Sequence, residues 1–353
     1  MAKFHSLIVT KVEKTIRDAI VVSLEPLDDA QVFDFTQGQY LTFRQIVEGT
    51  ELRRSYSICA GKGESLKVSI KRVDGGAFSN WANDRLTPGM QIDGMAPMGN
   101  FHTAIEPEVH KKYIAFAGGS GITPVLSILQ TTLTLEPYSE FCLVYGNRDV
   151  NTIMFKEELE DLKNQFMSRL TILHVLETGA ADIDLFHGRV DEEKCHLLFK
   201  HWVDIGAVDT AFICGPEPMM QGIAKALRAH GLPDERIKFE LFAAAQQGRL
   251  DQRKKVDAST YKPTELSIII DGIKHQITME TDQSILEAAL DHALDAPFSC
   301  KAGVCSTCRC KVGAGEVEMV ANHALEDYEI EQGYVLACQA YPKSERVDIE
   351  FET

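Results

Sequence analysis

The distribution of hydrophobic and polar positions divides the chain into three parts. In the first hundred residues, short alternating runs are separated by Gly, Pro and Asp, which predicts antiparallel strands. We expect these strands at Ser6–Val12, Ile20–Leu24, Tyr40–Gln45 and Leu66–Val73. Many short strands with turn residues between them are typical of an antiparallel β-barrel. We therefore predict a barrel over residues 1–105.

After this region the pattern changes to strand, glycine loop and helix, and it repeats along residues 106–242. Expected strands are Tyr113–Ala117, Phe141–Tyr145, Leu170–Val175 and Ala211–Cys214. Expected helices begin at Thr123 and cover Phe155–Asn164 and Met219–His230. Strands that alternate with helices form a parallel sheet covered by those helices. This part is predicted to be a Rossmann-like α/β domain.

The last part begins with residues 243–264, which show no apolar period and predict a linker. Residues 265–353 then predict a small β-grasp domain. Its expected elements are a hairpin of Leu266–Ile270 and Lys274–Thr278 around Asp271-Gly272, and a helix Ile285–His292 with a capping box of Ser284 and Glu287. The predicted fold is thus multidomain, with a barrel, a parallel-sheet domain and a β-grasp domain in series.

Composition narrows the class of protein. The chain of 353 residues is 44% hydrophobic and 25% charged, as in ordinary soluble proteins, and its net charge of −16 argues against binding to nucleic acid. We see neither a signal peptide nor a segment that could span a membrane, so we expect a cytoplasmic protein. From residue 265 onward there are 17 acidic but only 6 basic side chains. This acidic surface would attract a basic redox partner, or it would simply keep the domain soluble.

Four cysteines near the C-terminus carry the strongest chemical signal. Cys300, Cys305, Cys308 and Cys338 have the C-x4-C-x2-C…C spacing of a plant-type [2Fe–2S] site, and Gly303 lets the backbone bend around an inorganic core. Zinc is the nearest alternative, although its usual spacing is two C-x2-C pairs. A disulfide framework is the third. The remaining cysteines are expected to be reduced thiols: Cys59, Cys142, Cys195, Cys214 and Cys310.

A predicted strand of the barrel carries Arg54, Tyr56 and Ser57. Arg54 and Tyr56 project to the same side of the strand, so a diphosphate and a flat ring would both find a partner there, and Ser57 would reach a ring nitrogen. The alternative is an amphipathic strand with surface arginines. This pattern indicates a flavin only together with a second signal.

That second signal is a glycine loop at Gly75 and Gly76, just before a predicted helix start. The backbone amides of Phe78 and Ser79 would cradle a phosphate there. An ordinary turn is the alternative. Together with Lys71 on the preceding strand, the loop favours a site for a flavin diphosphate.

Two further loops follow buried strands and precede helices, as dinucleotide-binding loops do. The first has Gly118, Gly119 and Gly121, with Thr123 as a candidate polar contact to flavin or nicotinamide; the second has Cys214, Gly215 and Pro216. Cys214 is either a core thiol or a group beside the nicotinamide.

Two other positions bear on the nucleotide and the flavin. Arg148 would bind a 2′-phosphate and favour NADPH, whereas the neighbouring Asp149 would suit the free 2′-hydroxyl of NADH. Glu240 and Phe242 place an acid and an aromatic ring on the same side of a strand near the flavin. Core packing is the alternative for Phe242.

These motifs together resemble the ferredoxin–NADP reductase superfamily, specifically the ring-hydroxylating reductases with a C-terminal ferredoxin domain. The resemblance covers essentially the whole chain. It implies FAD in the barrel, NADPH in the parallel-sheet domain, and a [2Fe–2S] cluster that delivers electrons to a di-iron oxygenase. It also implies that Arg54 binds the flavin phosphate, that Tyr56 lies against the isoalloxazine, that Ser57 lies near N5, and that Thr123 and Cys214 lie near the nicotinamide. Ser57, Thr123, Cys214 and Glu240 are therefore the candidate catalytic residues.

Several alternatives remain open at this stage. FMN would satisfy the core contacts of the predicted flavin site as well as FAD. Reductases of steroid or other aromatic-ring oxygenases, or of a hybrid-cluster protein, share this order of domains. A zinc- or cluster-bearing binding module fused to a regulatory nucleotide-binding domain would carry out no turnover, and visible absorption by flavin and cluster would distinguish it from a reductase.

Overall fold

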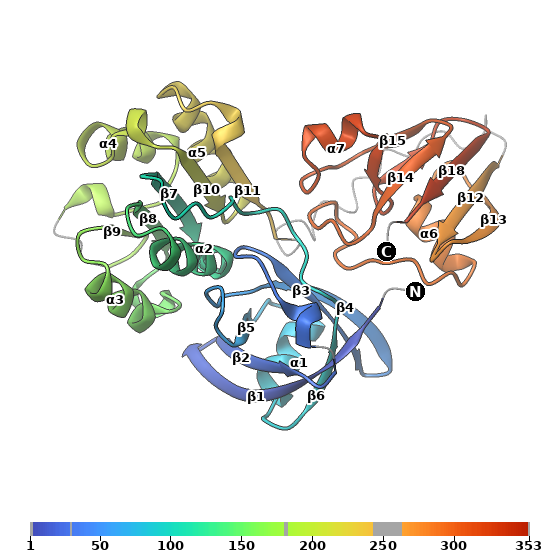
Figure 1. The fold of residues 1–353 in the computed structure, drawn as a ribbon, viewed down its shortest axis with the longest axis horizontal. Helices are drawn as coiled ribbons and strands as arrows, with labels where there is room; N and C mark the ends of the chain where they lie inside the picture. The colour runs from blue at the N-terminus through green and yellow to red at the C-terminus, as the bar shows by residue number, and fades with distance from the viewer. Residues whose placement is uncertain (1–2, 29, 180–182, 243–262, 352–353) are drawn as a thin grey trace.

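The computed structural model describes residues 3–28, 30–179, 183–242 and 263–351. It contains three units, which Figure 1 shows in blue, in green to yellow, and in orange to red along the chain. In the part of the chain that is described, no helix is long and apolar enough to cross a membrane. The three predicted units are therefore present and follow one another in the predicted order.

The first unit is an antiparallel barrel with the strand order β4-β3-β6-β1-β2-β5. Its strands are β1 (His5–Ile16), β2 (Ala19–Pro26), β3 (Tyr40–Val47), β4 (Thr50–Ser57), β5 (Leu66–Lys71) and β6 (Gln91–Gly94). A bridge between Ile58 and Val68 joins the chain just after β4 to β5, so the first and last strands of the sheet meet. Helix α1 (Ala77–Arg85) packs Phe78 and Ala82 into the barrel core.

The second unit has a parallel sheet with the order β11-β10-β7-β8-β9. Its strands are β7 (Lys112–Gly118), β8 (Glu140–Asn147), β9 (Leu170–Leu176), β10 (Thr210–Cys214) and β11 (Ile237–Glu240), and its helices are α2 (Ile122–Leu135), α3 (Lys156–Gln165), α4 (Glu192–His201) and α5 (Glu217–Ala229). Helices α2 and α3 share one hydrophobic cluster and α4 and α5 share another, so the sheet is covered on both faces. The strand order reverses between β7 and β10, and ligands of such sheets bind at that point.

Helix α4 is not predicted from the sequence, and strand β11 differs from the strand expected at Glu240 and Phe242. Helix α4 has only three buried side chains, Cys195, Leu198 and Phe199, among charged neighbours, which makes its apolar period short. Strand β11 is four residues long and ends at Glu240. Phe242 therefore lies beyond the strand, and the expectation that Glu240 and Phe242 share one strand face is wrong.

The third unit is a mixed sheet with the order β13-β12-β18-β14-β16, in which β12 pairs in parallel with β18. Its elements are β12 (Thr264–Ile270), β13 (Ile273–Met279), β14 (Arg309–Ala314), β15 (Val317–Met319), β16 (Tyr334–Leu336), β17 (Ala340–Pro342), β18 (Arg346–Glu350), α6 (Ile285–Asp291) and α7 (Asp327–Glu331). The predicted hairpin turn is confirmed, because Asp271 and Gly272 both have positive φ, 52° and 75°. The capping box of Ser284 and Glu287 is also confirmed.

The predicted linker can be compared with the structure only at its end. Its residues 243–262 lie outside the described residues. Thr264, its predicted last residue, is already the first residue of β12 and pairs with Met279.

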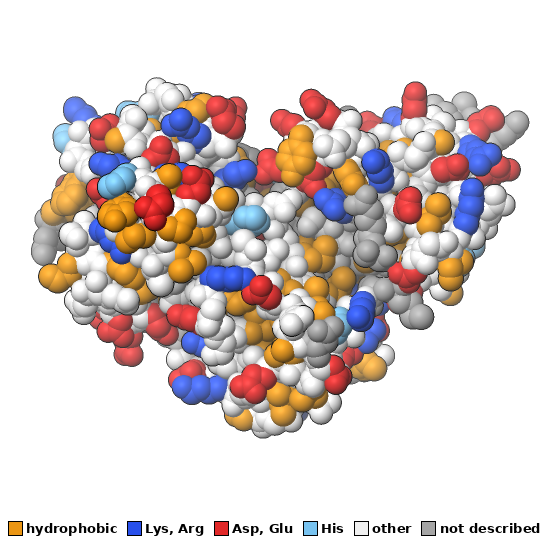
Figure 2. Space-filling view, viewed as in Figure 1, with side chains coloured by type: hydrophobic (Ala, Val, Ile, Leu, Met, Phe, Trp, Pro, Cys, Tyr) orange, Lys and Arg blue, Asp and Glu red, His pale blue; other side chains and the backbone are white. Residues whose placement is uncertain are grey.

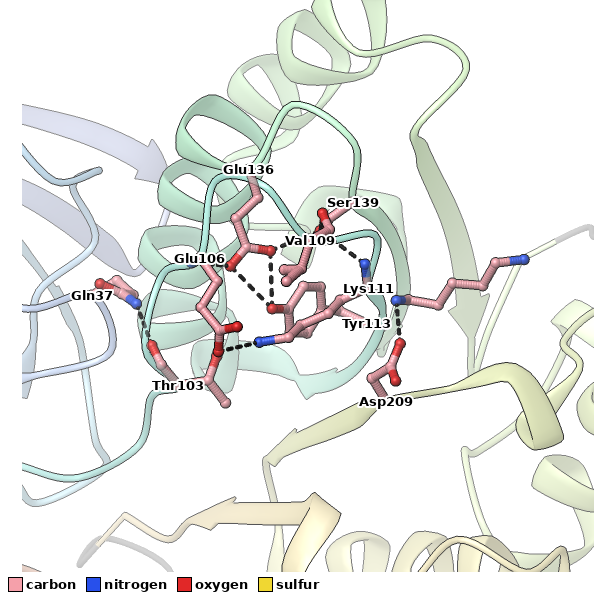
Figure 3. Close-up of polar contacts among 10 residues, drawn as sticks. Gln37, Thr103, Glu106, Val109, Lys111, Tyr113, Glu136, Ser139 and Asp209 are labelled. Atoms are coloured by element: carbon pink, nitrogen blue, oxygen red, sulfur yellow. Dashed lines mark hydrogen bonds and ion pairs between the residues drawn. The ribbon is translucent and has the colours of Figure 1, made fainter.

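The segment that joins the first two units is held by a buried carboxylate, which Figure 3 shows. Glu136 is fully buried and accepts hydrogen bonds from the Tyr113 hydroxyl at 3.0 Å, the Ser139 hydroxyl at 2.8 Å and the Glu106 amide at 3.0 Å. The segment is also tied to the barrel, because the Gln37 side-chain amide donates to the Thr103 carbonyl at 2.8 Å. These bonds fix the nucleotide-type domain against the barrel.

Candidate functional site

Strand β4 presents the predicted flavin residues on two different faces. Tyr56 packs its ring 5.6 Å from that of Phe78 on α1, and Arg54 is close enough for its charge to influence the pKa of Tyr56, which burial raises. Arg54 and Tyr56 thus share one face, as predicted from strand alternation. Ser57 belongs to the other face, and its hydroxyl is directed toward a neighbouring domain.

The glycine loop after β5 has the predicted form. Gly75 has a φ of 69°, and Gly76 is the N-cap of α1, so the amides of Phe78 and Ser79 lie in the first helical turn. The side chains of Phe78 and Ser79 make other contacts. Phe78 is buried in the barrel core, and the Ser79 hydroxyl braces the loop by accepting from the Val73 amide at 3.1 Å. Only their backbone amides remain as candidate phosphate ligands.

The two loops at the reversal of the parallel sheet lie directly against each other. A Cβ added at Gly121 would lie 2.1 Å from the Cys214 carbonyl oxygen, and one at Gly118 would lie 2.7 Å from the Pro216 ring. Gly215 in turn lies against Gly118. These glycines are therefore needed for the close approach of the two loops.

Thr123 and Cys214 are both buried at this junction. The Thr123 hydroxyl donates to the Ser120 carbonyl at 3.0 Å. Cys214 belongs to the same hydrophobic cluster as α2, and burial, with the charge of Glu240 as a smaller cause, raises the pKa of its thiol well above the usual value. The thiol of Cys214 is thus neutral at physiological pH, as expected for a core thiol.

A lysine lies beside Gly119, which has a φ of 53°. The Lys71 ammonium would lie 3.6 Å from a Cβ at Gly119, and burial together with the charge of Arg148 lowers the pKa of Lys71. The neighbouring Asp149 is already engaged, because its carboxylate accepts from the Asn151 amide at 2.8 Å and caps a short helical turn. The arrangement leaves Arg148 exposed beside a second cation.

Ser57, Cys214 and Glu240 come together across the interface between the barrel and the nucleotide-type domain. The Ser57 hydroxyl donates to the Glu240 carboxylate at 3.2 Å, and Cys214 pairs with Glu240 in the register of β10 and β11. Burial raises the pKa of Glu240 to about 8, while the bond from Ser57 opposes the shift. Glu240 is therefore mostly protonated at neutral pH. Phe242 packs against the hydrophobic cluster of α2.

All three domains line a cavity of about 610 Å³, at the hollow that separates the two upper lobes in Figure 2. Tyr40 reaches it from the barrel, Glu240 from the parallel-sheet domain, and Cys305 from the third domain. A pocket of this kind, with a perturbed carboxyl group in its wall, is a typical binding site. Tyr40 was not among the residues selected from the sequence.

The four predicted cluster cysteines gather at one end of the third domain, and none forms a disulfide. The Cys305 and Cys300 sulfurs are 3.1 Å apart, and Cys338 is within hydrogen-bonding reach of Cys300 and Cys308. Among the described residues, no group of three or more His, Cys, Asp or Glu side chains is arranged around a position for a single metal ion. The cysteines meet through sulfur–sulfur contacts instead.

The donor set and the loop around it fit an iron–sulfur cluster. Four thiols supply the ligands, and the Ala302 amide donates to the Cys300 sulfur at 3.3 Å. Gly303 has a φ of 74°, and a Cβ there would lie 2.8 Å from the Ala321 carbonyl oxygen, so the bend requires glycine. Cys310 is fully buried in the domain core and is a packing thiol.

The barrel also contacts the third domain through residues that the sequence analysis missed. These are Tyr40 on β3 and Arg53 and Ser55 on β4, the last with its hydroxyl 2.8 Å from that of Ser299. A signal for them is present in β4 itself, where polar side chains occupy both faces of the strand from Arg53 to Ser57. A barrel strand that is polar on both faces indicates a second binding partner.

Comparisons with known proteins agree with this arrangement. Family models match an oxidoreductase FAD-binding domain at residues 6–103, an oxidoreductase NAD-binding domain at 116–225 and a 2Fe-2S iron-sulfur cluster binding domain at 268–343. The barrel thus binds FAD, the parallel-sheet domain binds a nicotinamide nucleotide, and the C-terminal domain binds a [2Fe–2S] cluster.

Two curated relatives are similar over most of the chain. One is a component of the 1,2-phenylacetyl-CoA epoxidase of Escherichia coli, with 41% identity over 100% of this chain and 99% of that protein. Another is the ferredoxin reductase component of 3-ketosteroid-9-alpha-monooxygenase of Mycobacterium tuberculosis, with 33% identity over 90% of this chain and 86% of that protein.

Solved structures support the fold. Phthalate dioxygenase reductase aligns with a TM-score of 0.59 and 24% identity over 99% of this chain and 98% of its own. An intact type IV self-sufficient cytochrome P450 monooxygenase aligns with a TM-score of 0.70 and 19% identity, over 98% of this chain and 41% of its own. The predicted fold class is confirmed.

Proposed function

The chain belongs to the ferredoxin–NADP reductase superfamily and is an oxidoreductase with FAD, nicotinamide and [2Fe–2S] domains; on this basis we propose that it is the NADPH-dependent reductase of a di-iron oxygenase that epoxidises phenylacetyl-CoA. The observation that carries the proposal is the cavity shared by Tyr40, Glu240 and Cys305, one residue from each domain. Full-length similarity to the epoxidase component supports the choice of partner.

The three cofactors together supply a change from two-electron to one-electron chemistry: nicotinamide gives two electrons at once, a flavin takes both and releases them singly, and a [2Fe–2S] cluster carries one. We assign the cluster to Cys300, Cys305, Cys308 and Cys338. Burial of three of these sulfurs and the amide bond to the fourth support the assignment.

For the flavin we assign Arg54 and the amides of the Gly75-Gly76 loop to the diphosphate, and Tyr56 to the ring. Ser57 and Glu240 lie at the domain interface, where Ser57 donates to Glu240 and the neutral carboxyl group of Glu240 would donate a hydrogen bond to the ring edge. Since Glu240 keeps its proton at neutral pH, it would also avoid placing a negative charge beside a reduced flavin.

We assign the 2′-phosphate of NADPH to Arg148. Two observations favour NADPH over NADH. Lys71 adds a second cation near Arg148, and one oxygen of the Asp149 carboxylate is engaged in its cap by the Asn151 amide. A dianionic phosphate is attracted by both cations.

A variant of this arginine tests the preference. Arg148→Ala should raise the KM for NADPH about tenfold, the value of one charge-assisted hydrogen bond, and should leave the KM for NADH nearly unchanged. Arg189→Ala is the matched control, because Arg189 is an exposed arginine of the same domain that pairs with Glu177. An equal rise in KM for both nucleotides would contradict the assignment.

Reconstitution tests the proposed partner. The purified chain is mixed with the oxygenase component of a phenylacetyl-CoA epoxidase, phenylacetyl-CoA, NADPH and dioxygen. One NADPH should be consumed per epoxide formed, because one oxygen atom of dioxygen enters the epoxide and the other leaves as water. The oxygenase of a 3-ketosteroid monooxygenase serves as the comparison, because its reductase is also similar over most of the chain. Product formation with the steroid enzyme but not with the epoxidase would reject the proposed partner and retain the reductase.

A further inference from the structure

The face of the barrel that touches the ferredoxin domain is the reverse side of the strand that carries the flavin residues. Along β4, Arg54 and Tyr56 lie on one face, whereas Arg53 and Ser55 lie on the other and contact the ferredoxin domain. Neighbouring β3 adds Tyr40 to this second face, opposite Ser57 in the register. One strand therefore carries residues of both proposed cofactor sites: Arg54 and Tyr56 on one face, and Ser55, next in the chain to Tyr56, on the face that contacts the ferredoxin domain.

The contacts from this face reach residues that adjoin the cluster cysteines. The Ser55 hydroxyl lies 2.8 Å from that of Ser299, which precedes Cys300. The Tyr40 hydroxyl accepts from the Ser306 amide at 3.2 Å, and Ser306 follows Cys305. We call residues 299–308 the cysteine loop.

The hydroxyl of Tyr40 is held by several groups of the cysteine loop. It lies 3.3 Å from the Ser306 hydroxyl and 3.4 Å from the Thr307 hydroxyl, in addition to its bond from the Ser306 amide. Its ring is buried and lies against Gly99, where an added Cβ would come within 3.1 Å of it. These contacts hold the Tyr40 side chain in one position. Its hydroxyl therefore fixes the position of the cysteine loop relative to the barrel.

These contacts create a short path of covalent bonds and one hydrogen bond between the proposed flavin site and the proposed cluster site. Tyr56, assigned to the flavin ring, is bonded through the chain to Ser55, whose hydroxyl reaches Ser299, the neighbour of Cys300. The path contains a single hydrogen bond between the side chain at one cofactor and the ligand at the other. Electron transfer weakens steeply with each gap between atoms, so the positions of these two hydroxyls bear directly on its rate.

We propose that Tyr40 and Ser55 are positioning residues that hold the cysteine loop against the flavin strand and thereby set the rate of electron transfer from flavin to cluster. The inference rests on the proposed function and adds the residues that govern its internal step. That step moves one electron from the reduced flavin to the oxidised cluster, and it neither forms nor breaks a bond between heavy atoms. The transfer from nicotinamide to flavin does not pass through these contacts.

Rapid mixing with NADPH under anaerobic conditions tests the proposal, since flavin and cluster bleach at different wavelengths. In Tyr40→Phe and in Ser55→Ala, cluster reduction should be about tenfold slower than in the unmodified protein, in the range known for residues that orient metal ligands. Flavin reduction should stay within about twofold, because Arg54, Tyr56 and the nucleotide loops are unchanged.

The matched controls remove a hydroxyl elsewhere. Ser69→Ala removes a buried barrel serine that donates to the Ile20 carbonyl at 2.9 Å, and Tyr138→Phe alters an exposed tyrosine of the nucleotide domain. Both should leave the two rates unchanged. Iron and flavin contents are measured for every variant, and loss of the cluster from Tyr40→Phe or Ser55→Ala would overturn the positioning role.

Amide hydrogen exchange gives a second readout that is independent of turnover. In Tyr40→Phe the Ser306 amide loses its acceptor, so a peptide covering the cysteine loop should exchange about fivefold faster, the equivalent of about 1 kcal/mol for one net hydrogen bond. Peptides of the nucleotide domain should be unaffected. Unchanged exchange in the loop would overturn the contact itself.

The outcomes separate this inference from the proposed function. If the unmodified protein bleaches neither flavin nor cluster with NADPH, the proposed function fails. If the unmodified protein reduces both while Tyr40→Phe and Ser55→Ala reduce the cluster just as fast, only the positioning role fails. An equal slowing of flavin and cluster reduction would also overturn it, because the effect would then lie before the internal step.

Discussion

The barrel meets its two neighbours in physically different ways. Toward the nucleotide domain, barrel residues such as Val21 and Phe101 belong to the same hydrophobic cluster as α2, and the buried Glu136 network fixes the joining segment. Toward the ferredoxin domain the cores are separate, and the contacts are polar. A shared apolar core resists separation, whereas hydrogen bonds and partly exposed ion pairs are exchanged for water at small cost.

The ion pairs on the ferredoxin side illustrate the difference. Arg53 is buried between the Phe298 ring, 4.4 Å from its guanidinium carbon, and Asp295, whose carboxylate lies 3.3 Å away and whose side chain is 39% exposed. Lys238 pairs with Glu326 at 3.4 Å across the nucleotide and ferredoxin domains. The first junction thus rests on a shared apolar core, whereas the ferredoxin domain is held mainly by polar contacts. The following predictions test that contrast.

The largest effect is expected from removing a cluster ligand. Cys305→Ser should reduce NADPH-dependent reduction of cytochrome c on the order of a hundredfold, because that acceptor takes electrons from the cluster, while ferricyanide reduction by the flavin persists. Steady-state assays with both acceptors measure this. Cys310→Ala, which removes a buried packing thiol of the same domain, should keep both activities. Parallel loss of both activities in Cys305→Ser would contradict a separate cluster step.

Disrupting the buried junction between the barrel and the nucleotide domain should lower the stability of the protein. Glu136→Ala leaves the Tyr113 hydroxyl and the Glu106 amide without their acceptor, so the free energy of unfolding of the nucleotide domain should fall by about 3 kcal/mol. Urea unfolding followed by tryptophan fluorescence measures the change. Glu140→Ala, an exposed carboxylate 3.8 Å from Lys112, should change stability by less than about 0.5 kcal/mol. Equal effects of the two variants would show that the network is not the anchor.

Disrupting the polar junction between the barrel and the ferredoxin domain should instead change how often the two domains are docked. Arg53→Ala should raise the ratio of separated to docked ferredoxin domain about tenfold, or about 1.4 kcal/mol, because it removes the pair with Asp295 and the stacking on Phe298. Small-angle scattering at low and high salt measures this ratio. Arg44→Ala is the control, since Arg44 pairs with Asp93 inside the barrel. An unchanged scattering profile for Arg53→Ala would show that the docking rests on other contacts.

The remaining prediction concerns pH at the interface with the nucleotide domain. The pKa of Glu240 is raised from 4.5 to about 8, so between these values the unfolded chain has lost a proton that the folded chain keeps. Stability should therefore decrease as pH rises from about 5 to 8. Glu240→Gln should remove this part of the dependence, and thermal unfolding of both proteins at pH 6 and pH 9 measures it. If the Tm of Glu240→Gln were higher than that of the unmodified protein by the same margin at pH 6 and at pH 9, this result would contradict the raised pKa of Glu240.

The cysteine spacing and the glycine loops show how far sequence reasoning reaches. Ligand order in an iron–sulfur loop and the positive φ of a turn are local properties, so Cys300 to Cys308, Gly75 and the Asp271-Gly272 hairpin are all recognisable from the sequence. Strand and helix positions in the parallel sheet follow from period and length, except for α4, whose apolar pattern is too short, and for the end of β11, which lies at Glu240.

Other features depend on residues far apart in the chain. Whether Cys214 is a core thiol depends on its burial beneath α2, and whether Asp149 competes with Arg148 depends on its cap to Asn151. The raised pKa of Glu240 arises from its burial in the folded chain, against which the bond from Ser57 of the barrel acts. Residue type alone specifies none of these environments.

The three domains, their cofactor classes and the four cluster cysteines can be recognised from the order of residues, because alternation, glycine position and ligand spacing are encoded locally. The way in which the cofactor sites face each other is a property of the folded chain. Tyr40, Ser55 and Ser299 are ordinary residues in the sequence, and they gain a role because folding places them within hydrogen-bonding distance across more than 240 positions of chain.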